Sequence, residues 1–216
     1  MLIKNFLKPA YKITPPLIKK TIVNCYQFTY SSLKGAKNIQ SINFDKDHSS
    51  VCVLGNGPSL VQDKEKIRGL IDKQDFICVN NFCDDDIYIQ IKPKLYVFLD
   101  EYFFSSKAHP DWIKRREKTF KIINEKTSWN MKIVVPLNAD ISILKEYIKN
   151  TKIEILKVNT LNLYVDRYNK LTKFLFDSGV FGPPKINVLI YAIYLAILSE
   201  YKNINIFGAD LSFHND

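Results

Sequence analysis

The chain has 216 residues, of which 46% are hydrophobic, and its 31 lysines and arginines exceed its 22 acidic residues to give a formal net charge of +9. With 14 phenylalanines and 12 tyrosines but only 7 glycines and 9 prolines, the composition excludes collagenous and low-complexity chains and supports one ordinary globular domain. The four cysteines (Cys25, Cys52, Cys78 and Cys83) have no close metal-binding or redox spacing, so we expect reduced thiols, buried at Cys52 and Cys78, and a cytoplasmic protein.

The excess positive charge lies in the N-terminal segment. Residues 1–44 contain seven lysines and no acidic residue, and the first carboxylate is Asp45. Without these seven lysines, the other 172 residues carry 24 basic and 22 acidic groups. The sequence therefore divides into a basic, amphipathic arm over 1–44 and a nearly neutral domain over 45–216. Because no basic groove extends over this domain, nucleic acid is not an expected partner.

Apolar residues alternate with lysines over residues 1–24 of the arm. No apolar run there is long enough for a signal-peptide core or a membrane span. Pro9, Pro15 and Pro16 are expected to interrupt any helix, which leaves two short amphipathic pieces at most. Two readings stay open: a peripheral anchor on an anionic membrane surface, or a solvated arm that packs on the domain.

From Ser50 onward, short β-rich runs alternate with longer amphipathic segments. We expect strands over 50–54, 76–79, 95–99, 132–135, 153–158 and 203–207. Helices are expected between the first two strands to about residue 70, and then near 111–124, 141–149, 163–176 and 184–200. The last of these is apolar on most faces but too short to span a membrane, so we expect it to be buried. The alternation predicts an α/β, Rossmann-like fold, in which a mostly parallel sheet has helices on both faces.

Ligands of such sheets bind at the carboxyl ends of the strands. The first expected strand is followed by Gly55-Asn56-Gly57-Pro58-Ser59. The glycines allow the backbone to approach a ligand closely, and Pro58 suits a helix start whose free amides can receive an anion or a nucleotide. The turn is neither the G-x-G-x-x-G dinucleotide fingerprint nor a P-loop. A tight structural turn is the alternative.

Polar residues also follow the second and third expected strands. Asn80 and Asn81 come after the second, where side-chain amides can recognise a nucleobase edge or a sugar hydroxyl. Asp100 comes after the third, where a carboxylate can bind ribose hydroxyls or act as an acid or base. The alternatives are turn-capping asparagines and an aspartate that caps a helix.

Near the C-terminus, Ser178 and Gly179 precede the buried helix and are expected to leave open amides near its positive end. Asp210 follows the last strand, which places it at the same edge of the sheet. The acidic run from Asp84 to Asp86 contains an Asp-x-Asp spacing, but a solvated loop explains it better than a metal site. His48 and His109 are expected in loops, and His214 stands two residues before the last one.

This ordered set of motifs resembles a known superfamily. It is similar to the bacterial sialyltransferases that use CMP-sialic acid, and to the domain shared by archaeal 6-hydroxymethylpterin diphosphokinases and motility-associated flagellin glycosylation factors. The resemblance covers residues 50–216. It implies that the cytidine nucleotide is held by residues from four places in the chain, namely Gly55, Asn56, Gly57, Ser59, Asn80, Ser178, Gly179 and Asp210.

The chain also departs from the sialyltransferases. Asp100 stands where they have an asparagine, and Ser212 replaces the tyrosine that follows their last-strand aspartate. Their catalytic histidine comes from a lid region downstream of the last motif, beyond Asp216. We therefore expect either a domain truncated at its C-terminal end or a shortened relative with incomplete chemistry.

Together these features predict a glycosyltransferase-like domain of bacterial surface-polysaccharide biosynthesis that uses a nucleotide-activated, CMP-type sugar. Asp100 and Asp210 are the candidate catalytic carboxylates. The expected partners are the nucleotide sugar, a glycan or glycolipid acceptor and, through the arm, the anionic inner face of the membrane. One alternative is a pterin pyrophosphokinase that uses ATP, with Mg²⁺ held by Asp100 and Asp210. The other alternative is a non-catalytic, nucleotide-sugar-binding remnant. Apart from the Mg²⁺ of the first alternative, no cofactor is implied.

Overall fold

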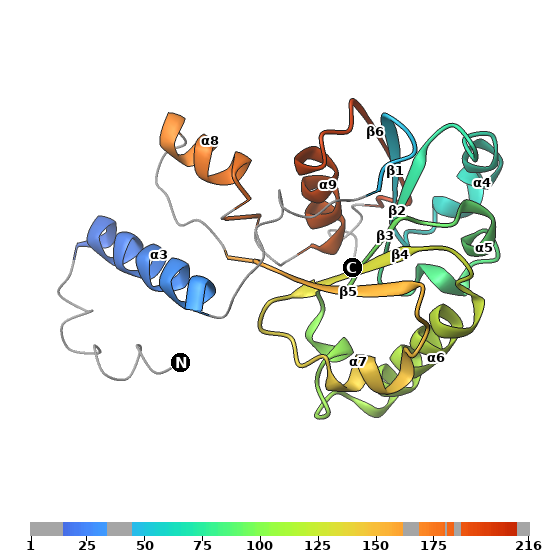
Figure 1. The fold of residues 1–216 in the computed structure, drawn as a ribbon, viewed down its shortest axis with the longest axis horizontal. Coiled ribbons are helices and arrows are strands. Elements are labelled where there is room, and N and C mark those ends of the chain that lie inside the picture. Colours follow the sequence, from blue (N-terminus) through green and yellow to red (C-terminus); the bar gives the residue numbers. More distant parts are fainter. Residues whose placement is uncertain (1–14, 34–44, 162–168, 180, 184–186, 211–216) are drawn as a thin grey trace.

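A computed structural model of the chain describes residues 15–33, 45–161, 169–179, 181–183 and 187–210 (Figure 1). Its centre is a six-stranded sheet in the order β5-β4-β3-β2-β1-β6, in which every neighbouring pair is parallel. The strands are β1 (Ser50–Leu54), β2 (Asp75–Val79), β3 (Leu95–Val97), β4 (Met131–Pro136), β5 (Ile153–Val158) and β6 (Asn203–Phe207).

Helices cover both faces of this sheet (Figure 1). One face packs against α4, α5, α6 and α7, and the other packs against α9. The predicted α/β, Rossmann-like fold is therefore confirmed. The helices are α3 (Pro16–Leu33), α4 (Leu60–Arg68), α5 (Tyr88–Ile91), α6 (Pro110–Lys126), α7 (Ser142–Tyr147), α8 (Lys170–Asp177) and α9 (Val188–Leu198), with 3₁₀ turns η2 (Phe82–Asp84) and η3 (Glu101–Phe103).

The strands form here because their side chains are apolar on both faces. Along β1, Cys52 and Leu54 enter the core beneath α4 to α7, whereas Val51 and Val53 enter the core beneath α9. Side chains that alternate between two buried faces are typical of a parallel sheet with helices on both sides. The six expected strands all occur, with ends that differ by no more than two residues.

Each expected helix of the domain has a counterpart among the described helices, although their bounds differ, and the short helix α5 was not predicted. The helix expected over 184–200 is α9, which begins at Val188 because the Asn187 side chain accepts hydrogen bonds from the amides of Leu189 and Ile190. Residues 184–186 lie outside the described part of the chain. The helix expected near 163–176 is α8, and residues 162–168 before it also lie outside the described part.

The described helix of the arm begins at a proline, as expected, but is longer than a short piece. Residues Pro16–Leu33 form the 18-residue helix α3, and residues 1–14 and 34–44 lie outside the described part of the chain. Pro16 occupies the first turn, where proline is well tolerated because its missing N–H would have no intrahelical partner. Ile18, Ile22 and Phe28 of α3 are exposed. Across the described residues, no helix combines the length and the apolar character of a membrane span. Peripheral membrane contact by the arm stays a prediction.

The order of the strands determines where a ligand can bind. From β1 to β5 each new strand is added on the same side of the sheet, whereas β6 pairs with β1 on the other side. The chain thus crosses back over the sheet between β5 and β6, and α9 covers the opposite face on the way (Figure 1). In open α/β sheets such a reversal opens a crevice at the carboxyl ends of the two strands, here β1 and β6.

Candidate functional site

A pocket of about 340 Å³ lies at the carboxyl ends of β1 and β6. It is lined by the turn after β1, the end of β2, the start of α9 and the turn after β6. The structure therefore brings together residues that are up to 155 positions apart in the sequence. From the predicted set, those that line the pocket are Gly55, Asn56, Gly57, Asn80 and Asp210.

The two glycines after β1 are required by the turn after β6. A Cβ atom on Gly57 would stand 2.0 Å from Oδ2 of Asp210, and one on Gly55 would stand 2.3 Å from the carbonyl oxygen of Gly208. The Gly57 amide donates to that same carbonyl at 3.0 Å. The close approach that these glycines permit is thus between two loops of the protein. This agrees with the structural-turn alternative for Gly55 and Gly57 and leaves their contact with a ligand untested.

The side chain of Asp210 binds the backbone at the start of α4. Its Oδ2 accepts a hydrogen bond from the Ser59 amide at 2.8 Å, and the Leu60 amide donates to the Gly57 carbonyl. The expectation that these amides stand free for an anion is therefore wrong. A carboxylate at the positive end of a helix is stabilised there and would repel a phosphate placed beside it. This end of the pocket is suited to ligand hydroxyl groups, which can donate to Asp210.

Asn80 is held in a left-handed conformation, with φ of 48°. Its amide donates to the Val97 carbonyl at 3.1 Å, and its own carbonyl accepts from the Tyr96 hydroxyl at 2.8 Å. The side-chain Nδ2 donates to Oδ2 of Asp100 at 2.8 Å. Its Oδ1 is buried and has no hydrogen-bond partner among the described residues. An unpaired buried acceptor costs about 1–3 kcal/mol, so it favours a ligand that brings a donor to this position.

Asp100 immediately precedes η3, yet its side chain makes no hydrogen bond to that turn. The helix-cap alternative for this residue is therefore wrong. Burial raises the pKa of the Asp100 carboxyl above its ordinary value of 3.8, and the hydrogen bond from Asn80 opposes that rise. A half-buried carboxyl with a raised pKa, at the sheet edge that carries the pocket, has the character of a general acid or base.

Asn81 has a packing role. Its Nδ2 donates to the Tyr102 hydroxyl at 3.0 Å, and its Oδ1 accepts from the Thr119 hydroxyl at 2.7 Å. Because both ends of this buried amide are bonded to neighbouring elements, Asn81 links the turn after β2 to η3 and α6. It does not line the pocket.

Ser178 and Gly179 end α8 and do not begin α9. The Ser178 amide donates to the Phe174 carbonyl at 2.8 Å, and the Gly179 amide donates to the Phe176 carbonyl at 3.0 Å. Gly179 has a φ of 68°, which is the usual conformation of a glycine that terminates a helix. The expectation of open amides here is wrong. Neither residue lines the pocket, and a nucleotide-binding role for them stays a prediction.

Sequence reasoning missed Asn187, which does begin α9. Its Oδ1 accepts from the Leu189 amide at 2.8 Å, and the residue lines the pocket beside Val188 and Leu189. A signal for it was present, because an asparagine directly before an apolar helical run is typical of an N-cap. The positive end of the buried helix therefore reaches the pocket through Asn187.

The acidic run after β2 is neutralised by lysines. Asp84 pairs with Lys118 at 3.1 Å, Asp85 pairs with Lys64 at 2.9 Å, and Asp86 pairs with the same lysine at 3.1 Å. Within the described ranges, no group of three or more histidines, cysteines, aspartates or glutamates is placed to hold a metal ion. The ion pairs agree with the interpretation of this run as a charged surface loop.

Mg²⁺ was expected only for the ATP-dependent alternative, with Asp100 and Asp210 as its ligands. In each of these residues one carboxylate oxygen already accepts a hydrogen bond from the protein, from Asn80 and from the Ser59 amide respectively. Mg²⁺ needs only one oxygen from each of two carboxylates, together with waters and substrate phosphates, so a Mg²⁺ ion held by Asp100 and Asp210 stays a prediction of that alternative.

The described histidines lie outside the pocket. His48 contacts the buried Asp75 carboxylate at 3.2 Å, at the amino end of β2 and thus at the opposite edge of the sheet. His109 caps α6 by accepting from the Asp111 amide. His214 lies outside the described residues. Among the described residues that line the pocket, Asp210 is the titratable one, and Asp100 is linked to the pocket through its hydrogen bond with Asn80.

No family model and no curated protein matches the chain. Among solved structures it is similar to one described as the MAf glycosyltransferase from Magnetospirillum magneticum AMB-1, with 16% sequence identity and a TM-score of 0.49. The similar region covers 88% of this chain and 28% of that one. This chain thus spans less than a third of the length of the protein to which it is similar.

Proposed function

We propose that this chain is a glycosyltransferase-like domain that binds a nucleotide-activated sugar in the pocket between β1 and β6. The observation that carries this proposal is the meeting of Asn56, Asn80 and Asp210 in one pocket at the reversal of strand order. The ordered motifs that supply these residues are those that resemble the CMP-sialic-acid-dependent sialyltransferases. A CMP-activated sugar is accordingly the donor that we propose.

Each polar residue of the pocket has a role that its contacts support. Asp210, fixed by the Ser59 amide, would accept hydrogen bonds from the ribose hydroxyls. Asn80 would accept a donor such as the exocyclic amine of cytosine through its unpaired Oδ1. The exposed Asn56 would add a further polar contact at the mouth of the pocket.

Asp100 would act as the base of the transfer. Its carboxylate is held by Asn80 and would take the proton of the attacking acceptor hydroxyl. The hydroxyl oxygen would bond to the anomeric carbon of the donor as the bond from that carbon to the nucleotide phosphate breaks, and the phosphate would leave with the bonding electrons. The acceptor that we propose is a glycan or glycolipid, and the basic arm would bring the domain to an anionic membrane surface.

Calorimetric titration with CMP, CDP, UDP and ATP tests the proposal. We expect a cytidine nucleotide to bind, and Asn56→Ala to weaken its binding at least tenfold, which corresponds to about 1.4 kcal/mol. The matched control is Asn203→Ala, because Asn203 is an exposed asparagine at the amino end of β6. This control should bind as the parent protein does.

Three other results would contradict the proposal. If the folded protein binds no cytidine nucleotide, the pocket is not a site for a CMP-activated sugar. If it binds only ATP, and only with Mg²⁺, the pyrophosphokinase alternative is favoured. If it binds a cytidine nucleotide but transfers no sugar to any acceptor, a non-catalytic binding domain is favoured.

A further inference from the structure

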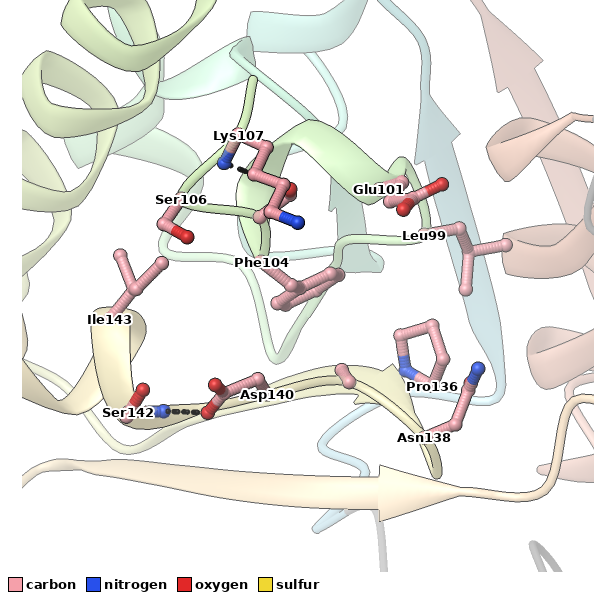
Figure 2. A pocket seen from close by; sticks show the side chains of 12 residues that line it. Leu99, Glu101, Phe104, Ser106, Lys107, Pro136, Asn138, Asp140, Ser142 and Ile143 are labelled. Atoms are coloured by element: carbon pink, nitrogen blue, oxygen red, sulfur yellow. Dashed lines mark hydrogen bonds between the residues drawn. The ribbon is translucent and has the colours of Figure 1, made fainter.

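A second pocket, of about 710 Å³, lies between the segment that follows β3 and the segment that follows β4 (Figure 2). Residues 99–107 form one wall, and residues 136–143 form the other. Because the sheet is parallel, this pocket opens at the same edge as the pocket between β1 and β6. Its volume falls within the range of about 300–1,000 Å³ that is usual for pockets that hold small ligands.

The lining combines an apolar floor with a polar rim. Leu99, Phe104 and Ala139 are each less than a tenth exposed and form the floor together with Pro136. Figure 2 shows polar side chains around this floor from both walls, including Glu101, Ser106, Lys107, Asn138 and Asp140. A sugar ring has the same division, since its C–H groups form apolar faces and its hydroxyls form a polar edge.

The lining carries charges of both signs. Glu101 and Asp140 contribute two carboxylates, and Lys107 contributes one ammonium group. A neutral ligand with many hydroxyl groups can donate to the carboxylates and accept from the lysine and the serines.

Both walls are held in place by the scaffold. The buried Arg116 of α6 donates from Nη1 to the carbonyls of Tyr102 at 2.8 Å and Ser105 at 2.6 Å, which fixes the first wall. In the second wall, the Leu137 amide donates to the Val158 carbonyl at 2.8 Å. A pocket formed in advance binds its ligand without the entropic cost of ordering loops.

Asp100 lines neither pocket but is linked to both through its neighbours. Its carboxylate accepts from Asn80, which lines the pocket between β1 and β6, and its sequence neighbours Leu99 and Glu101 line the second pocket. We propose that the second pocket binds the sugar acceptor of the transfer as a neutral pyranoside, so that its attacking hydroxyl reaches Asp100. This inference rests on the proposed function, and it identifies the class of substrate that the second pocket takes.

Saturation-transfer NMR tests the proposal with four probes: methyl β-galactoside, methyl β-glucoside, methyl N-acetyl-β-glucosaminide and lactose. The variant Ser106→Trp places an indole on the rim of the pocket at an exposed position. Ser49→Trp is the matched control, because Ser49 is also exposed but lies next to the amino end of β1. We expect at least one probe to bind the parent protein and Ser49→Trp, and to bind Ser106→Trp at least tenfold more weakly. If Ser106→Trp does not fold, Glu101→Ala replaces it with the same expected loss.

A CMP titration of the same samples separates this proposal from the proposed function. Equal CMP binding in all variants, with sugar binding lost only in the variant of the second pocket, supports both. CMP binding with no binding of any probe overturns the acceptor pocket and leaves the nucleotide site. Sugar binding that Ser106→Trp or Glu101→Ala does not weaken also overturns it. If the variant loses sugar binding and no sample binds a nucleotide, the second pocket is supported as a sugar site and the proposed function is overturned.

Discussion

The Asn80 side chain donates a hydrogen bond to the Asp100 carboxylate, with 2.8 Å between Nδ2 and Oδ2. The bond joins the turn after β2 to the turn after β3, and thereby connects the pocket at β1 and β6 with the pocket at β3 and β4. Burial raises the pKa of Asp100, and the hydrogen bond from Asn80 opposes that rise, so this bond also tunes the acidity of the carboxyl.

Asp100→Asn should increase stability and strongly reduce activity. Since burial raises the pKa of Asp100 above 3.8, ionising it costs folding free energy as the pH rises through the folded-state pKa. At pH 7 the variant should therefore have a higher free energy of unfolding than the parent protein. Below pH 3.8 the carboxyl is protonated in both folded and unfolded states, so this gain should vanish. Urea unfolding between pH 3 and 8 measures it, and transfer activity should fall about 10²–10⁴-fold.

Asp140→Asn is the control, because the pKa of Asp140 is shifted in the opposite direction to that of Asp100. Hydrogen bonds from Ser142, the backbone amide first, lower the pKa of Asp140, so its contribution to stability is present above pH 3.8 and is lost in acid. Asp140→Asn should therefore lose stability at pH 7. If Asp100→Asn and Asp140→Asn both lowered the free energy of unfolding at pH 7, the role of burial at Asp100 would be contradicted.

The fold could be predicted from the sequence because it depends on local patterns. Each strand is a short apolar run, and α9 is a long one, so burial alone determines their type. The contacts of the site are different in kind. Ser59 and Asp210 are 151 residues apart, and only the pairing of β6 with β1 brings them together. The motif after β1 therefore indicated open amides, while a residue at the other end of the chain occupies one of them.

The error at Ser178 and Gly179 has a similar origin. Small residues before an apolar helix suggest its start, but here they end the preceding helix α8, and Asn187 begins α9. The local signals for a helix end and a helix start both occur within ten residues. Only the structure shows which of them lines the pocket.

Gly57→Ala should be destabilising. The added Cβ would stand 2.0 Å from Asp210 Oδ2 and 2.7 Å from the Gly208 carbonyl oxygen, so the loops after β1 and β6 must separate. We expect a loss of about 2–4 kcal/mol in the free energy of unfolding, measured in urea, together with loss of nucleotide binding. Gly69→Ala is the matched control, because its nearest atom would be 3.4 Å away. Equal tolerance of both changes would show that the two loops do not pack this closely.

Asp210→Ala should free the start of α4 for an anion. Removing the carboxylate leaves the Ser59 amide without its partner, at a cost of about 0.5–2 kcal/mol. The exposed amide and the helix dipole should then attract phosphate, so inorganic phosphate should stabilise the variant against heat more than it stabilises the parent protein. Asp210→Asn retains an acceptor oxygen and should lose less stability. An equal response of all three proteins to phosphate would argue against the capping role of Asp210.

Arg116→Met should loosen the wall of the second pocket. The substitution keeps an unbranched apolar side chain but removes the donor to the Tyr102 and Ser105 carbonyls. Since hydrogen bonds from a charged group are stronger than neutral ones, we expect a loss of about 2–3 kcal/mol in urea unfolding, together with weaker binding of sugar probes. The neighbouring Arg115 is exposed, and Arg115→Met should stay within about 0.5 kcal/mol of the parent protein. Similar losses for the two arginines would contradict this role of Arg116.

The four thiols should differ sharply in reactivity. Cys25 is exposed on α3, whereas Cys52, Cys78 and Cys83 are buried, and burial raises the pKa of Cys52 and of Cys83 to about 12. Because the thiolate is the reactive form, a buried thiol with a raised pKa is inert. At pH 8 we expect one equivalent of thiol to react rapidly with DTNB, none in Cys25→Ser, and the remaining thiols only in denaturant. Rapid reaction of a second thiol in the native protein would show that the core around β1 and β2 opens to solvent, and the pocket after β1 would then lack a rigid base.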